Sequence, residues 1–183
     1  MEDKMNYNLK YIPSNSGMVI EKLKGSRIKK MTRFSSWPLD VVEQRLSLEK
    51  KNILSYTEGP ALLELHDGYS VAISTDDTLN SILLWVEPLK DEFGEDEFLV
   101  NDTDYYPIDF NDSRFSNVDW KQVLDSEIIG IETIKSDSPT AIQEALPNEN
   151  AIKILLANSK SIYFGFRTTD KAIDLIIKCN GQN

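Results

Sequence analysis

The feature that most constrains the fold is an internal repeat, in which residues 61–87 and 151–179 share one order of apolar and polar segments. Each copy reads as a strand, a polar turn, a second strand, a link rich in Thr and Asp, and a third, apolar strand. The third strands are residues 82–86 and 175–179, which correspond to within a residue or two. We therefore predict a three-stranded antiparallel meander that occurs twice.

The first copy carries the strongest local signal. Residues 61–66 and 69–74 are strand-like runs separated by Asp67-Gly68. Asp-Gly accepts the positive φ angles of a tight hairpin turn, and Leu63, Leu65, Tyr69, Val71 and Ile73 would form one apolar face. These residues predict a β-hairpin.

A three-stranded meander has an apolar face that nothing covers, so the two copies should cover each other or pack on helices. Helices are predicted at 38–48 and at 138–146, the second because Ser138-Pro139 is a helix start and Pro147 a stop. Residues 128–134 predict a further strand. The expected class is α+β, mostly antiparallel β, with two repeated three-stranded meanders and one or two short helices.

The chain has 183 residues, of which 40% are hydrophobic, enough to build a real core. We expect 1–183 to be a single compact domain built of two β-rich halves, at about 1–90 and 120–183. An acidic and aromatic connection, 91–119, would join them. A connection of that length is uncommon unless it is functional or disordered.

Charge is separated along the chain. The net charge is −10, but residues 1–34 carry eight basic and three acidic residues, a net of +5. A protein with this negative charge repels the phosphate backbone of nucleic acids, so general nucleic-acid binding is not expected. The same charge favours binding to basic partners. The basic stretch 22–33 could contact nucleic acid, but its alternation with apolar residues better suits an edge strand protected by lysines.

No set of residues predicts catalysis. His66 is the single histidine and belongs to a turn, and Cys179 is the single cysteine, without a nearby base to activate it. Phosphate-binding glycine loops, an esterase elbow and a zinc cluster are absent from the sequence. The acidic residues 101–104 lack the spacing of a calcium loop. We expect no enzyme activity, no catalytic residues, no metal and no cofactor.

The expected cellular compartment is inferred from three features that the sequence does not contain. Its first 17 residues are polar rather than a signal peptide, and no apolar run approaches the roughly 20 residues that cross a bilayer. A single cysteine forms no internal disulfide. These features predict a cytoplasmic protein with no membrane contact.

The best candidate for a binding site is the segment 91–119, which holds ten carboxylates, six aromatic residues and one arginine. Aromatic residues anchor interfaces, and carboxylates around them steer in a basic partner. An ordinary acidic surface or a self-repelling loop remains the alternative. The residues predicted to contact the partner are Asp91, Glu92, Glu95, Asp96, Glu97, Asp102, Asp104, Tyr105, Tyr106 and Asp109.

With its hairpin GPALLELHDGYSVAI (residues 59–73) in a small, acidic, β-rich chain, the sequence resembles immunity proteins of bacterial toxin–immunity systems, including contact-dependent growth inhibition. The resemblance implies a non-catalytic protein whose partner is a cognate toxin domain, for example a nuclease. It would neutralise the toxin by blocking its active site or a nearby surface. Two alternatives stay open: a hydrolase that uses carboxylates, and an adaptor that binds a peptide on an exposed strand edge.

Overall fold

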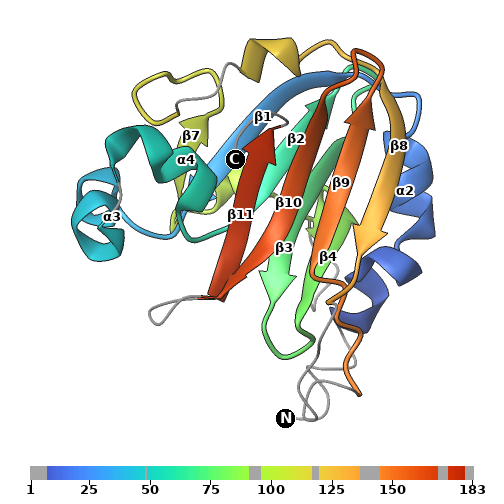
Figure 1. The fold of residues 1–183 in the computed structure, drawn as a ribbon, viewed down its shortest axis with the longest axis horizontal. Helices are drawn as coiled ribbons and strands as arrows, with labels where there is room; N and C mark the ends of the chain where they lie inside the picture. The colour runs from blue at the N-terminus through green and yellow to red at the C-terminus, as the bar shows by residue number, and fades with distance from the viewer. Residues whose placement is uncertain are drawn as a thin grey trace.

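Two antiparallel sheets lie face to face in the computed structural model of the chain (Figure 1). One core cluster contains buried side chains from both sheets, so the main core lies between the layers. The residues that the structure describes are 8–47, 49–90, 96–116, 120–136, 145–168 and 173–179.

The first sheet has five strands in the order β4-β3-β2-β1-β7. Its strands β2, β3 and β4 are consecutive in the chain and form the first predicted meander. Strand β1 precedes them, and β7 pairs with the other side of β1. The bounds are β1 (Ile28–Ser35), β2 (Ala61–Leu65), β3 (Ser70–Asp76), β4 (Ser81–Val86) and β7 (Tyr106–Asp109).

The second sheet has four strands in the order β11-β10-β9-β8. Strands β9, β10 and β11 form the second predicted meander, and β8 is the strand predicted at 128–134. The bounds are β8 (Ile128–Ile134), β9 (Ala151–Leu156), β10 (Ser161–Thr168) and β11 (Ile173–Cys179).

Short elements surround the sheets. The α-helices are α2 (Gly17–Leu23), α3 (Leu39–Leu46) and α4 (Ile53–Tyr56). The 3₁₀ turns are η1 (Leu9–Tyr11), η2 (Pro13–Asn15), η3 (Lys50–Asn52), η4 (Leu99–Asn101) and η5 (Trp120–Gln122). A two-stranded ribbon pairs β5 (Leu89–Lys90) with β6 (Asp96–Glu97).

The repeat is longer than the sequence pattern indicated, because β1 and β8 extend each meander to four strands. In the first half β1 pairs with β2 through an irregularity between Ile28 and Lys30. In the second half β8 pairs with β9 through the same irregularity, between Ile128 and Gly130. Each half is therefore a four-stranded antiparallel unit with a bulge near the start of its first strand.

The hairpin turns of the two halves match bond for bond. Leu65 N donates to Tyr69 O at 2.8 Å, and Leu156 N donates to Lys160 O at 3.0 Å. Each turn has its positive φ at the residue before the last, 92° at Gly68 and 64° at Ser159. The predicted Asp-Gly turn is confirmed, and the second turn reaches the same geometry without a glycine.

The halves also bond to each other reciprocally. Gly25 N donates to Ile128 O at 2.8 Å, and Asp125 N donates to Ile28 O at 2.8 Å. Gly25 and Asp125 hold equivalent positions in the two halves, and so do Ile28 and Ile128. Each half therefore donates one of two equivalent hydrogen bonds to the other half and accepts the second. Such an exchange is what an approximate two-fold relation between two copies produces.

The predicted α+β class and the two repeated meanders are confirmed. Helix α3 occupies the predicted 38–48, whereas the helix predicted at 138–146 falls almost wholly outside the described residues. The expectation that 22–33 ends in an edge strand is wrong, because β7 pairs with the free side of β1 and makes it an inner strand. No helix in the described ranges is long and apolar enough to cross a membrane.

Candidate protein-binding surface

The segment predicted to bind a partner is built onto the first sheet. Strand β7 pairs with β1, where Arg33 faces Ile108 and Ser35 faces Tyr106. The turn η4 and Tyr105 pack on a small cluster on the outer face of this sheet, formed by Phe34, Leu62 and Ala72. In its described part, the connection between the halves is therefore a structural element of the first half.

Two of the six aromatic residues of the segment belong to the core. Phe110 and Phe115 are 1% and 6% exposed, and Phe110 packs edge-on against Trp120 with the ring centres 4.7 Å apart. Ile108, on β7, is also buried. These side chains hold the segment in place and are not available to a partner.

Other apolar side chains of the segment point to solvent. Phe98 is 40% exposed, Val100 59% and Tyr106 42%. They are three of the eight large hydrophobic residues that are exposed in the described chain. Exposed apolar side chains gathered in one short segment and flanked by polar groups are typical of a protein interface.

Carboxylates lie between these apolar residues. Asp102, Asp104 and Asp109 are exposed, and no described lysine or arginine forms an ion pair with them. Two of them close local turns: Asp102 Oδ1 accepts from Asp104 N at 2.9 Å, and Asp109 Oδ1 accepts from Asn111 N at 2.8 Å. We define the acidic–aromatic surface as Phe98, Val100, Asp102, Asp104, Tyr106 and Asp109.

The single arginine of the segment does not neutralise this surface, because Arg114 is paired with Asp112. The guanidinium Nη2 lies 2.7 Å from Asp112 Oδ2. Hydrogen bonds from the Arg114 side chain hold the pKa of Asp112 below its ordinary value. Among the described residues, Arg114 therefore does not compensate the negative charge of the acidic–aromatic surface.

Hydrogen bonds to the carboxylate of Glu87 fix the turn that carries Phe98 and Val100. The carboxylate of Glu87, just beyond β4, accepts from Leu99 N at 3.0 Å and from Trp85 Nε1 at 2.7 Å. These bonds tie η4 to the end of β4. The turn that carries Phe98 and Val100 is thus held in a fixed position relative to the first sheet.

The ten predicted contact residues divide into four groups. Asp91, Glu92 and Glu95 lie outside the described residues, and of Asp96 and Glu97 only the backbone of β6 is described. Asp102, Asp104, Tyr106 and Asp109 are all exposed, but the pairing of β7 with β1 places the side chains of Tyr106 and Asp109 on opposite faces of the strand. Tyr105 does not join them, because its half-buried ring packs against Phe34 at 6.2 Å between centres.

Phe98 and Val100 are exposed beside the predicted contact residues but were not among them. Phe98 was counted among the aromatics of the segment, but its neighbours Leu99 and Val100 gave no alternation that could separate a buried from an exposed side chain. In the structure Leu99 packs on the sheet and Val100 points away from it. Only the 3₁₀ turn, which the sequence does not signal, decides this.

The basic stretch 22–33 is not a continuous basic face. Lys30 is exposed and lies 3.5 Å from Glu64, whereas Arg33 is fully buried and donates to the carbonyl of Thr57. A buried guanidinium cannot reach a phosphate. This arrangement favours the structural interpretation of the stretch over nucleic-acid contact.

His66 lies at the hairpin tip, as predicted, but it has a partner that the sequence did not indicate. Its Nε2 lies 2.6 Å from Asp125 Oδ1, and both side chains are about half exposed or more. Asp125, but not His66, lines an open hollow of about 470 Å³. Its lining residues are Arg27, Leu124, Asp125, Ser126, Glu127, Ala157 and Asn158.

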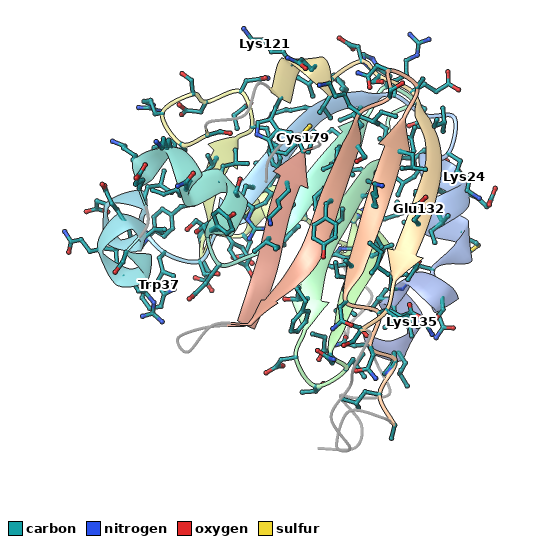
Figure 2. The ribbon with its side chains drawn as sticks, viewed as in Figure 1. Lys24, Trp37, Lys121, Glu132, Lys135 and Cys179 are labelled. Atoms are coloured by element: carbon teal, nitrogen blue, oxygen red, sulfur yellow. The ribbon has the colours of Figure 1, made fainter. Side chains whose placement is uncertain are left out.

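Cys179, the other residue considered for catalysis, is buried at the end of β11 (Figure 2). Across the described ranges, no three His, Cys, Asp or Glu side chains are placed to hold a metal ion.

Comparisons of the chain with protein-family models, with curated proteins and with solved structures found no match. The function is therefore argued from the geometry of these surfaces.

Proposed function

We propose that this chain is a non-catalytic binding protein that recognises a basic protein through its acidic–aromatic surface. The observation that supports this most is the combination of uncompensated carboxylates at Asp102, Asp104 and Asp109 with the exposed Phe98, Val100 and Tyr106.

The two kinds of side chain have different roles in such an interface. Exposed carboxylates attract a cationic partner over a distance and raise the association rate, an effect that salt screens. Apolar side chains become desolvated in the complex and lower the dissociation rate. Because η4 and β7 are fixed to the first sheet, both kinds are held on one flank of the molecule, with Tyr106 and Asp109 on opposite faces of β7.

The class of partner that fits best is a toxin domain, so we propose that the chain is an immunity protein. Toxins that act on nucleic acid need a cationic cleft to hold phosphates. A carboxylate surface can occupy such a cleft, or a surface beside it, in place of the substrate. The net charge of −10 supports the same partner class.

A second candidate function rests on the contact between His66 and Asp125, because Asp125 also lines the hollow together with Ser126 and Glu127. A histidine held by a carboxylate is a pair that hydrolases use. We propose it as the weaker alternative, because both members of the His66–Asp125 pair are solvent-exposed. Changing His66→Ala with Asp125→Asn distinguishes the two: loss of biological activity in a folded protein supports hydrolysis, and full retention supports binding alone.

The proposed function is tested by protection of cells. The toxin encoded beside this gene in its native genome is expressed together with the parent or with the variant Asp102→Lys/Asp104→Lys/Asp109→Lys. The parent should restore growth and the variant should not. A matched control reverses three exposed acids elsewhere, Asp40, Glu43 and Asp77, and should still protect. Equal protection by all three proteins would exclude the acidic–aromatic surface as the inhibitory site.

A further inference from the structure

The four outer edges of the two sheets are not equally protected. On β4, Ser16 Oγ donates to Leu84 O at 3.3 Å and Ile82 N donates to Glu149 O at 2.9 Å, so N-terminal turns and a later loop cover this edge. Helix α4 packs along β11 (Figure 1). Strand β7 has only four residues and includes Pro107, which has no N–H to offer.

The fourth edge, β8, has none of these protections over most of its length. It has seven residues, and no described strand pairs with its outer side. Ile129 is 59% exposed and Ile134 38%, and Glu132 and Thr133 are exposed as well. Helix α2 lies beside β8 in Figure 1. An exposed, apolar edge of this length is a template for strand addition.

The repeat shows what would occupy this edge. Strand β8 corresponds to β1, since Ile28 and Ile128 hold the same place in their bulged pairings. The outer side of β1 is occupied by β7, which pairs Thr32 with Asp109 and Arg33 with Ile108. In the described chain, the equivalent place beside β8 is open.

The backbone of β8 offers hydrogen bonds at this place. Leu156 N bonds to Lys160 O, so by antiparallel alternation Leu156, Ile154 and Ile152 bond to β10. In the pairing of β8 with β9, Ile131 lies opposite Ile154 and Thr133 lies opposite Ile152. Because Ile154 and Ile152 bond to β10, the N–H and C=O groups of Ile131 and Thr133 point to the outer side of β8. The equivalent residue Met31 does use its outward carbonyl, which accepts from Phe110 N.

We propose that the free edge of β8 is a binding site for an extended peptide segment of another protein, added antiparallel as β7 is added to β1. The segment would carry a basic residue opposite Glu132 and an apolar residue opposite Thr133. Glu132 and Lys135 mark this flank in Figure 2. Charge complementarity selects the basic residue, because Glu132 is half exposed and only loosely paired with Lys153 at 3.8 Å.

This site goes beyond the proposed function, since β7 and β8 lie on opposite flanks of the molecule (Figure 1). A partner on the acidic–aromatic surface therefore leaves β8 open. A second copy of this chain is the less suitable occupant, because two molecules of net charge −10 repel each other.

The probe is a peptide that copies β7. Residues 104–111, Asp-Tyr-Tyr-Pro-Ile-Asp-Phe-Asn, are synthesised once unchanged and once with Asp109→Lys. Transferred from β1 to β8, the register of β7 places position 109 opposite Glu132. Affinities are measured by fluorescence anisotropy with the full chain, and the site is mapped by amide chemical shifts.

The parent should bind the Lys peptide on the order of fivefold more tightly than the unchanged peptide, with shifts at Ile131 and Thr133. In the protein variant Glu132→Lys this preference should reverse. Thr133→Pro, which removes an outward N–H, should weaken binding roughly tenfold, whereas Thr133→Val should not. Absence of binding at millimolar peptide, shifts confined to β7, or an unchanged preference in Glu132→Lys would overturn the proposal.

Discussion

Tyr105 and Tyr106 are neighbours in the chain, yet their side chains have different environments. The ring of Tyr105 packs against Phe34 and joins the cluster on the outer face of the first sheet. Tyr106, the first residue of β7, is 42% exposed. One residue therefore stabilises the surface, and the other is available to a partner.

This difference predicts opposite effects for two similar variants. Tyr105→Ala should lower the free energy of unfolding by about 1–3 kcal/mol, because a partly buried aromatic contact is lost. Tyr106→Ala should change it by less than about 0.5 kcal/mol, as is usual at the surface. Urea unfolding of both variants measures this, and equal losses would contradict the assigned environments.

Gly59 is required by a close approach of the backbone. Its φ is 121°, and a Cβ at this position would lie 2.2 Å from the carbonyl oxygen of Phe34. Gly68 also has a positive φ, 92°, but a Cβ there would meet no atom within 4 Å. Replacing either glycine by a residue with a Cβ would strain the backbone, because both have a positive φ. Only at Gly59 would the Cβ also clash with the carbonyl of Phe34.

We therefore expect Gly68→Ala to cost on the order of 1 kcal/mol of unfolding free energy from backbone strain alone. Gly59→Ala should cost a further ~1–3 kcal/mol, because the Phe34 carbonyl and β1 must move. Thermal or urea unfolding of the pair measures the difference. A Gly59→Ala variant as stable as Gly68→Ala would show that the chain does not approach so closely.

Among the elements, the turn between β3 and β4 depends on one carboxylate. Asp76 accepts from Thr78 Oγ1 at 2.6 Å, from Asn8 Nδ2 at 2.7 Å and from the backbone N–H groups of Thr78 and Leu79. Burial raises the pKa of Asp76, but these hydrogen bonds outweigh it and hold the pKa below 3.8. The ionised form is therefore favoured in the folded protein.

A lowered pKa in the folded state stabilises the protein at pH values above the ordinary pKa, and this contribution is lost as the pH falls through the lowered value. The stability difference between the parent and Asp76→Asn should be largest at neutral pH and should shrink below pH 3.8. Unfolding at pH 7 and at pH 3 tests this, with Asp77→Asn as the exposed control. A difference that is the same at both pH values would contradict it.

Elements with strong local patterns could be predicted from the sequence, and elements that depend on distant contacts could not. The β2–β3 hairpin has an Asp-Gly turn and alternating residues, so its prediction is confirmed. Strand β7, with the sequence Tyr-Pro-Ile-Asp, has a proline and no clear alternation, and only its pairing with β1 makes it a strand. Because that pairing was not foreseen, β1 was wrongly expected at an edge.

The segment 91–119 could be singled out from the sequence as a candidate, but the placement of its side chains could not. Charge and aromatic content marked the segment, because both are properties of composition. Which aromatic side chains of the segment are buried and which are exposed could not be predicted. Phe110, for example, is buried because it packs against Trp120, a residue of the following turn. The link between His66 and Asp125 joins residues 59 positions apart, and a sequence alone does not show such a contact.

The repeat explains the architecture of the whole molecule, and strand β7 is a departure from that repeat. Two four-stranded units cover each other's apolar faces, as the repeat requires. Among the described residues, a fifth strand, β7, is added to the first unit alone, and it carries part of the acidic–aromatic surface. Because the sheets can form without that surface, its exposed carboxylates should be replaceable with little loss of stability.

The central claim is that this surface binds a basic protein, and the most direct measurement is the kinetics of that binding. The partner captured from the native host by the parent is purified, and its association is measured by surface plasmon resonance at two ionic strengths. The triple variant Asp102→Lys/Asp104→Lys/Asp109→Lys should associate at least about tenfold more slowly at low salt and lose most of the salt dependence.

Tyr106→Ala should instead speed dissociation, by an amount equivalent to about 1–3 kcal/mol for a desolvated anchor. The control with Asp40, Glu43 and Asp77 reversed should keep most of the parent's association rate. Association and dissociation rates in the triple variant and in Tyr106→Ala that equal those of the parent would contradict the account.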